Sequence, residues 1–213
     1  MRRRTVAKDA GVSLVEVLVA MGLFGLITTT LLGMALGTSR VTEDTRRFAG
    51  LNEESRLAME RFSRELRQAR EVQYFDETPS GDVTLRFWTD FDGDGSADVS
   101  VSDPEVLTYT WSSATKDLTL AGQGAGEAKV LSVSVSDFSV DLFSSLWEHD
   151  TDGDGLASWE ELDAAGAPVG DDDNVPDEEL KRIDLVRVSM TVLDGPRAQT
   201  YRTEVTLRNL SQT

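Results

Sequence analysis

The sequence predicts an α+β protein in which a long N-terminal helix packs on an antiparallel β-sheet. Three observations predict this class. Residues 12–39 form an apolar stretch of 28 residues in which Glu16 is the only charged side chain. The segment after it repeats its apolar residues every three or four positions, as an amphipathic helix does. Beyond residue 80, apolar and polar residues alternate in short runs, which is typical of half-buried strands.

The apolar stretch is long enough to cross a membrane, since a spanning helix needs about 20 apolar residues. Before it stand four basic residues and one acidic residue, namely Arg2, Arg3, Arg4, Lys8 and Asp9. This excess of positive charge predicts a cytoplasmic N-terminus and an exported remainder. A carboxylate in lipid costs about 3 kcal/mol without a partner, so Glu16 predicts a counter-charge, and an amine would serve.

The amphipathic segment is expected to continue the same helix. No proline interrupts residues 12–76, so a single helix of about 55 to 60 residues is predicted, transmembrane first and amphipathic afterwards. Its second half would pack one face on the sheet. The residues of that face are Phe48, Leu51, Ser55, Ala58, Phe62, Leu66 and Ala69.

Six strands are predicted after residue 80, separated by clusters of Gly, Asp and Pro. In the first of them, Val83, Leu85 and Phe87 alternate with their neighbours on the other face. The last two flank residues 194–197, whose sequence Asp-Gly-Pro-Arg predicts a hairpin turn. The predicted strands are residues 83–88, 106–112, 118–121, 130–143, 183–193 and 200–207.

The composition argues against several function classes. The chain has 38 acidic and 21 basic residues and a net charge of −17, which becomes −20 once a leader of net charge +3 is removed. No basic cluster lies outside the helix, so cation binding is expected and direct nucleic-acid binding is not. The chain has no cysteine, hence no disulfide and no thiol nucleophile. A catalytic triad would require the single histidine, His149, and no serine lies in a nucleophile-elbow pattern that this histidine could activate. No enzymatic activity is therefore expected.

An acidic loop of twelve residues, 150–161, satisfies the EF-hand calcium pattern. Oxygen donors stand at its first, third, fifth, ninth and twelfth places, and Gly155 at the sixth place allows the sharp turn. Partial helices are expected on both sides, over residues 143–147 and 159–165. The alternative is an acidic surface turn that holds no metal. The predicted Ca²⁺ ligands are Asp150, Asp152, Asp154, Ser158, Glu161 and the backbone carbonyl of Leu156.

A second loop, residues 90–98, repeats the first half of this pattern. Its twelfth place holds Val101, so Asp98 or a carboxylate from elsewhere, such as Asp103, is expected to complete the shell of a calcium ion. The position between predicted strands suggests a half-loop similar to those of thrombospondin and dockerin domains. The predicted ligands are Asp90, Asp92, Asp94, Ser96 and Asp98.

A third acidic run comprises residues 171–174 and 177–179, with irregular spacing and no comparable glycine. We expect a solvated loop there, and a contribution to one of the two ions is the alternative. Because clustered carboxylates repel one another, bound Ca²⁺ would order these loops and would substitute for the absent disulfides.

The residues from Gly11 to Ala20 resemble the class III signal of type IV pilins and of type II secretion pseudopilins. The resemblance implies that a prepilin peptidase cuts between Gly11 and Val12 and that the new N-terminus is methylated. It also implies that Glu16, the fifth residue of the mature chain, pairs with the amine of Val12 on a neighbouring subunit. The family most often has phenylalanine where this chain has Val12. The implied parts are a leader (1–11), a membrane and filament helix (12–39) and a pilin-like exported domain (40–213).

Residues 64–69, near the predicted helix end, and 205–209, near the C-terminus, resemble W-type minor pilins and the J-type minor pseudopilin. This implies the pilin fold and a low-copy subunit of the tip or priming complex of a type IV pilus, with a calcium-stabilised head. The implied partners are other minor and major pilins, the prepilin peptidase and a tip adhesin, met first in the inner membrane and then at the cell surface. The alternatives are a minor pseudopilin of type II secretion and a membrane-anchored calcium-binding protein that does not polymerise.

Overall fold

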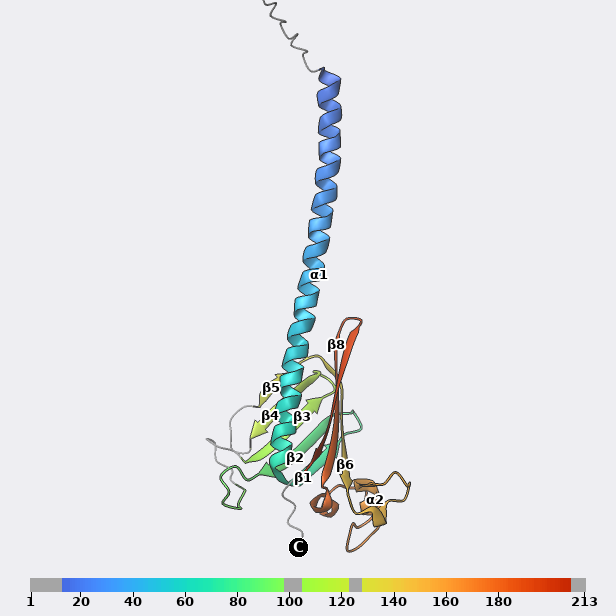
Figure 1. Ribbon diagram of the computed structural model, residues 1–213. Coiled ribbons are helices and arrows are strands. Elements are labelled where there is room, and N and C mark those ends of the chain that lie inside the picture. The colour runs from blue at the N-terminus through green and yellow to red at the C-terminus, as the bar shows by residue number, and fades with distance from the viewer. Residues whose placement is uncertain (1–12, 98–104, 123–127, 208–213) are drawn as a thin grey trace, which may run out of the picture. The chain divides into compact units, whose positions relative to one another are not determined.

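The computed structural model describes residues 13–97, 105–122 and 128–207, and the chain divides into two compact units, Met1–Arg47 and Phe48–Thr213. One α-helix, α1 (Leu14–Gln68), belongs to both units (Figure 1). Ser13 is its N-cap, because the Ser13 hydroxyl oxygen accepts a hydrogen bond from the backbone N–H of Glu16 at 3.2 Å. The predicted long helix followed by antiparallel strands is confirmed, and the chain is of the α+β class.

Within the first unit, α1 exposes apolar side chains around its whole circumference. Its threonine hydroxyls donate hydrogen bonds to carbonyls one turn earlier, as Thr28 does to Phe24 at 2.8 Å and Thr38 to Met34 at 2.9 Å. Such bonds leave few unpaired polar groups on the surface of a helix. Over the part of the chain that the structure describes, α1 is the one helix long and apolar enough to cross a membrane.

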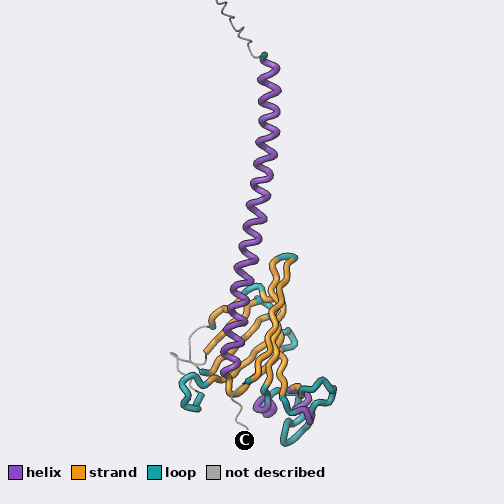
Figure 2. The backbone as a smooth tube through the Cα atoms, viewed as in Figure 1, coloured by secondary structure: helices purple, strands orange, loops and turns teal. Residues whose placement is uncertain are grey.

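The second unit contains two antiparallel sheets (Figure 2). The five-stranded sheet has the order β1-β2-β3-β4-β5, with β1 (Ala69–Glu77), β2 (Val83–Thr89), β3 (Val106–Ser112), β4 (Asp117–Gly122) and β5 (Lys129–Ser132). The four-stranded sheet has the order β7-β6-β8-β9, with β6 (Val135–Ser144), β7 (Ala157–Ser158), β8 (Leu185–Asp194) and β9 (Arg197–Thr206). The short helices are η1 (Trp147–His149), α2 (Trp159–Ala164) and η2 (Glu178–Arg182).

The core of this unit forms where the last turns of α1 meet both sheets. Phe62 is fully buried and packs edge-to-face on Phe87 and Tyr109 of one sheet and on Phe138 of the other. Its ring centroid lies 4.5 Å from that of Tyr109. The Tyr109 hydroxyl donates a hydrogen bond to the Glu65 carboxylate, so the polar end of this buried ring is satisfied. One helix therefore joins the two sheets through a single aromatic cluster.

The predicted helix length of about 55 to 60 residues is confirmed, since α1 has 55 residues and ends at Gln68. The strand that follows was not predicted: the next nine residues, beginning with Ala69, form β1, which pairs with β2. Two register shifts in β1 place Ala69, Val72 and Phe75 in the core, three residues apart instead of two. Because bulges change the period of burial, this strand has the spacing of a helix in the sequence.

Four further expectations are tested by the structure, and two of them are confirmed. The hairpin at residues 194–197 is confirmed, with Asp194 opposite Arg197. The single strand expected over residues 130–143 is two strands, β5 and β6, separated at Ser134, whose φ is 58°. The partial helix expected over 143–147 is wrong, since β6 continues to Ser144 and only the 3₁₀ turn η1 precedes the acidic loop. The α-helix expected after that loop is present as α2.

Phe62→Ala should lower the free energy of unfolding of the second unit by about 3 to 5 kcal/mol, because it removes the ring that contacts both sheets. The measurement is denaturant unfolding of the full chain in detergent, followed by tryptophan fluorescence. Leu57→Ala on an exposed position of the same helix is the control and should cost less than about 0.5 kcal/mol. Equal losses in the two variants would contradict this core.

Candidate functional site

The acidic loop at residues 150–161 is ordered by hydrogen bonds from its own backbone to its carboxylates. Gly153 and Gly155 adopt φ angles of 83° and 94°, a region that favours glycine. These conformations turn successive N–H groups toward the acidic side chains. The bonds run from Gly153 N to Asp150 Oδ1 (2.6 Å), Gly155 N to Asp150 Oδ2 (2.8 Å), Asp154 N to Asp152 Oδ1 (3.0 Å) and Leu156 N to Asp154 Oδ1 (2.9 Å).

Glu161 ties the end of this loop to its beginning. Its Oε1 accepts hydrogen bonds from the N–H groups of Thr151 at 2.8 Å and Asp152 at 3.2 Å, and from the Thr151 hydroxyl. Its Oε2 accepts from the N–H of Ser158, which caps α2 in return. Donation from the Thr151 hydroxyl, then from the N–H of Ser158, lowers the pKa of Glu161 to about 2. The carboxylate is therefore ionised at neutral pH.

Three of the predicted ligands of this loop come together. Carboxylate oxygens of Asp150, Asp152 and Glu161 lie within 4.8 Å of one another, a separation that suits oxygens around one cation with bonds of about 2.3 to 2.6 Å. Asp154 and Ser158 lie in the loop but outside this group: Asp154 accepts the N–H of Leu156, and Ser158 caps α2. The loop therefore offers a partial shell of three carboxylates.

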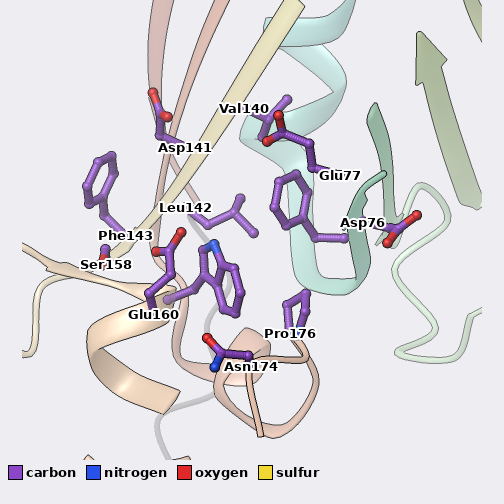
Figure 3. A pocket seen from close by; sticks show the side chains of 12 residues that line it. Asp76, Glu77, Val140, Asp141, Leu142, Phe143, Ser158, Glu160, Asn174 and Pro176 are labelled. Carbon is purple, nitrogen blue, oxygen red and sulfur yellow. The ribbon is translucent and has the colours of Figure 1, made fainter. Parts of the chain in front are cut away.

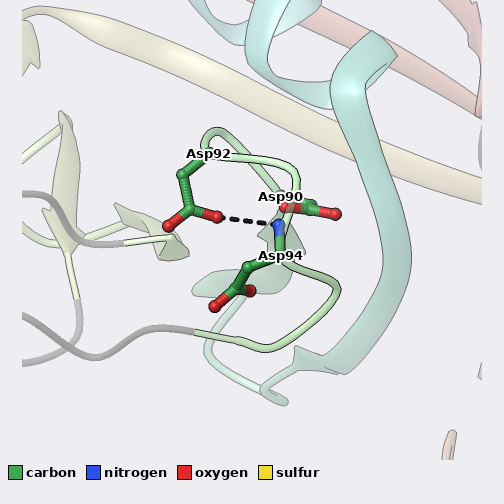
Figure 4. A group of neighbouring side chains, drawn as sticks. All are labelled: Asp90, Asp92 and Asp94. Atoms are coloured by element: carbon green, nitrogen blue, oxygen red, sulfur yellow. Dashed lines mark hydrogen bonds between the residues drawn. The ribbon is translucent and has the colours of Figure 1, made fainter.

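The loop at residues 90–96 repeats three of these four hydrogen bonds, and Figure 4 shows the one between Asp92 and Asp94. Gly93 and Gly95 have φ angles of 82° and 81°. Carboxylate oxygens of Asp90, Asp92 and Asp94 lie within 4.8 Å of one another. Ser96 is not in that group, and its hydroxyl donates to Asp94. Asp98 and Asp103 lie outside the described residues. The bonds run from Gly93 N to Asp90 Oδ1 (2.7 Å), Asp94 N to Asp92 Oδ1 (3.0 Å) and Ser96 N to Asp94 Oδ1 (2.7 Å).

Glu105 occupies the place in this second loop that Glu161 occupies in the first. Its Oε1 accepts the N–H of Phe91 at 2.6 Å and that of Asp92 at 3.3 Å, the second and third residues of the loop. The pairing of β2 with the chain before β3 positions it, because the Glu105 carbonyl accepts the N–H of Thr89 at 2.9 Å. Sequence reasoning missed Glu105. The sequence does place an acidic residue, Glu105, directly before a predicted strand. Its burial, with 2% of its surface exposed, is visible only in the structure.

The two loops differ in their electrostatics. Arg70 of β1 forms an ion pair with Asp90, and its guanidinium lies 5.5 Å from the centre of the Trp88 ring. Asp150 has no such partner: within the described ranges, no Lys or Arg forms an ion pair with it or with the other two carboxylates of its group. A positive charge, that of Arg70, thus compensates part of the negative charge of the loop at residues 90–96. The negative charge of the loop at residues 150–161 has no such compensation.

The third acidic run is more structured than the solvated loop that the sequence predicts. Residues 171–174 are exposed, but Glu179 is fully buried in η2. Oxygens of Asp171 and Asp173 lie within 4.8 Å of an oxygen of Asp163, at the end of α2. These residues group with Asp163 and with neither of the two loops.

A cavity of about 300 Å³ lies beside the first loop, between β1, β6 and α2 (Figure 3). Phe75, Leu142 and Trp159 supply apolar surface, and four carboxylates, those of Asp76, Glu77, Asp141 and Glu160, line it as well. None of its lining residues is Lys, Arg or His. Such a lining offers no cationic side chain to a phosphate or another anion.

The proposed assembly residue Glu16 lies in the first turn of α1, where a negative charge interacts favourably with the helix dipole. This interaction with the helix dipole is a second reason for an acid at this place. Gly11 and Val12 lie outside the described residues, so the predicted cleavage site stays a prediction. Comparison with models of protein families, with curated proteins and with solved structures gave no match.

The stability that Glu161 contributes should depend on pH in metal-free protein. Its pKa is lower in the folded state than in the unfolded chain, so the contribution is present above about pH 4.5 and is lost as the pH falls toward 2. The thermal midpoint in chelator, measured from pH 6 to pH 2, should therefore fall less steeply for Glu161→Gln than for the wild type. The control is Glu160→Gln, on the exposed neighbour, and a profile for Glu161→Gln identical to that control would contradict the role of Glu161.

Proposed function

We propose that this protein is a minor pilin of a type IV pilus, a low-copy subunit of the tip or priming complex whose exported head is stabilised by calcium. The observation that carries the proposal is the signal of Gly11 and Glu16 at the start of a helix that continues without a break from Leu14 to Gln68. The apolar first part of that helix supports a single membrane span before assembly. The antiparallel sheets on its last turns are compatible with a pilin-like fold.

In this proposal Glu16 has two successive environments. In the membrane its carboxylate lacks a partner and is costly, and in a filament it meets the free amine of Val12 on a neighbouring subunit. The difference in free energy favours transfer of the helix from lipid into the filament. The partners are then other minor and major pilins and a tip adhesin, and the prepilin peptidase acts first.

The two acidic loops are proposed as calcium sites. Glu161 and Glu105 would each supply the last carboxylate of a shell that the aspartates begin. Because Arg70 already compensates Asp90, we expect the loop at residues 90–96 to bind Ca²⁺ more weakly than the loop at 150–161. Modules of this kind outside cells bind at about 10⁻⁴ to 10⁻³ M, so both sites would be filled by the calcium of the medium.

Glu16→Ala should abolish or strongly reduce incorporation into filaments, because it removes the proposed partner of the amine. The measurement is the amount of this subunit in sheared pili, with leader processing checked by mass spectrometry of the N-terminus. Glu43→Ala, on an exposed acid of the same helix, is the control and should assemble normally.

Wild-type incorporation by Glu16→Ala would contradict the pairing. A mature chain that still begins at Met1 would instead favour the membrane-anchored surface protein that does not polymerise. Loss of secreted enzymes on deletion of the gene, with normal pili, would favour the minor pseudopilin of type II secretion.

Millimolar Ca²⁺ should raise the thermal midpoint of the protein. At a concentration of 100 times the dissociation constant, one site contributes about 2.7 kcal/mol, or roughly 5 to 10 °C for a unit of this size. Asp150→Ala should remove the larger part of the shift, and Glu105→Gln should weaken binding at the other loop by at least about tenfold. Asp117→Asn, on an acid of β4 outside the acidic groups, should leave the shift unchanged, and an equal shift in all four proteins would contradict both sites.

A further inference from the structure

The cavity between β1, β6 and α2 combines an apolar floor with acidic walls. The floor includes Phe75, Leu142 and Trp159, and the rings of Phe75 and Trp159 meet edge-to-face with their centroids 6.4 Å apart. Figure 3 shows the carboxylates of Glu77 and Glu160 on either side of Leu142. The volume of about 300 Å³ is at the lower end of the range of ligand pockets, so the cavity has room for one long side chain.

The acids of this cavity have no partner within the protein. Among the residues that the structure describes, none of the four carboxylates forms an ion pair with Lys or Arg or accepts a hydrogen bond. Arg187, which lies opposite Asp141 in the sheet, pairs with Glu204 at 3.2 Å and does not line the cavity. The negative charge of the cavity is therefore uncompensated.

The spacing of these acids does not suit a metal ion. Carboxylates that share one ion bring their oxygens close together, as the aspartates of the two acidic loops do within 4.8 Å. Over the described ranges, the groups with that spacing include none of the four acids of the cavity. Charges that are spread around aromatic rings match a larger, organic cation.

An arginine side chain matches this lining better than lysine does. Its aliphatic stem would pack on the apolar floor, and its planar guanidinium would lie on the ring of Trp159 and donate to carboxylates on both sides. The lysine ammonium is a strongly hydrated point charge that cannot donate to two carboxylates in this planar way. The protein makes the same kind of contact internally, since the guanidinium of Arg70 lies 5.5 Å from the centre of the Trp88 ring.

The cavity also adjoins an unpaired strand edge. β7 pairs only with Phe143 and Ser144 of β6, so residues 137–142 of β6 have no strand partner on that side in the described part of the chain. Val140 and Leu142 of this stretch line the cavity. An extended polypeptide can donate to and accept from such an edge along its backbone, whereas a single amino acid offers too few groups to do so. The edge therefore favours a polypeptide as the source of the arginine.

We propose that this cavity binds an arginine side chain from an extended segment of a partner protein. The guanidinium would lie against Trp159 between Glu77 and Glu160, and the backbone of the segment would follow the free edge of β6. The net charge of −17 would attract a basic segment. Glu77, Glu160 and Trp159 are not predicted calcium ligands, so the site is independent of the calcium proposal and can be tested in chelator.

The test is a titration of the full chain, labelled with ¹⁵N at tryptophan and held in detergent with chelator, with the peptide acetyl-Thr-Val-Arg-Val-Thr-amide. The indole N–H signal of Trp159, assigned with Trp159→Phe, should shift. The signal of Trp147, which is 73% exposed and lies outside the cavity, should stay in place. The same peptide with neutral citrulline instead of arginine should bind at least about tenfold more weakly, and equal binding of the two peptides would overturn the site.

Two double variants locate the binding. Glu77→Gln with Glu160→Gln should weaken binding of the arginine peptide at least about tenfold, because both carboxylates beside the guanidinium lose their charge. The matched control is Glu71→Gln with Glu148→Gln, on acids of β1 and η1 that do not line the cavity, and it should bind as the wild type does. The two double variants have the same net charge, so equal affinities would contradict recognition by the cavity.

Two further ligands test the source and the type of the cation. N-acetyl-arginine amide offers the same guanidinium without an extended backbone and should bind at least about fivefold more weakly than the peptide. Equal affinity would mean that the cavity takes a small guanidinium compound, which would overturn the polypeptide as its source. A peptide with lysine instead of arginine should also bind more weakly, and equal binding would overturn the preference for arginine.

Discussion

The second unit must order several groups of carboxylates without a disulfide to hold them. In each group the chain uses the same interaction, in which backbone N–H groups donate to aspartate and glutamate oxygens of the segment itself. These bonds set the path of the loops, and they also bring oxygens of like charge within 4.8 Å. The hydrogen bonds that fold these segments therefore create the repulsion that a cation would relieve.

The surrounding structure serves to bring distant residues to these loops. Strand pairing at Thr89 places Glu105 against the loop at residues 90–96. The capping box of α2 places Glu161 against the loop at 150–161. Both depend on sheets that are held together by the aromatic cluster around Phe62 at the end of α1. In the proposed function the same helix would have a second task, since its apolar first part would enter a membrane and then a filament.

Much of the fold and of the acidic loops could be predicted from the sequence, for physical reasons that differ between segments. The loop at residues 150–161 could be identified from the sequence because its acidic side chains and its glycine follow one another at fixed spacing. Glu105 could not be identified in this way. It reaches its loop through the pairing of β2 and β3, and no fixed spacing in the sequence encodes that contact. β1 was not predicted, because its bulges bury every third residue and its sequence lacks the alternation of a regular strand. Glu179 seemed exposed because composition does not reveal which acid of a run turns inward.

The proposal that the two acidic loops of this protein bind calcium can be tested most directly by anomalous diffraction. Crystals of the protein soaked in Tb³⁺, which replaces Ca²⁺ at oxygen sites, would be measured at the terbium absorption edge. If the two loops bind Ca²⁺, anomalous peaks should appear among Asp150, Asp152 and Glu161 and beside Asp90 and Glu105. Well-ordered loops with no anomalous peak at residues 150–161 would contradict calcium binding by this protein.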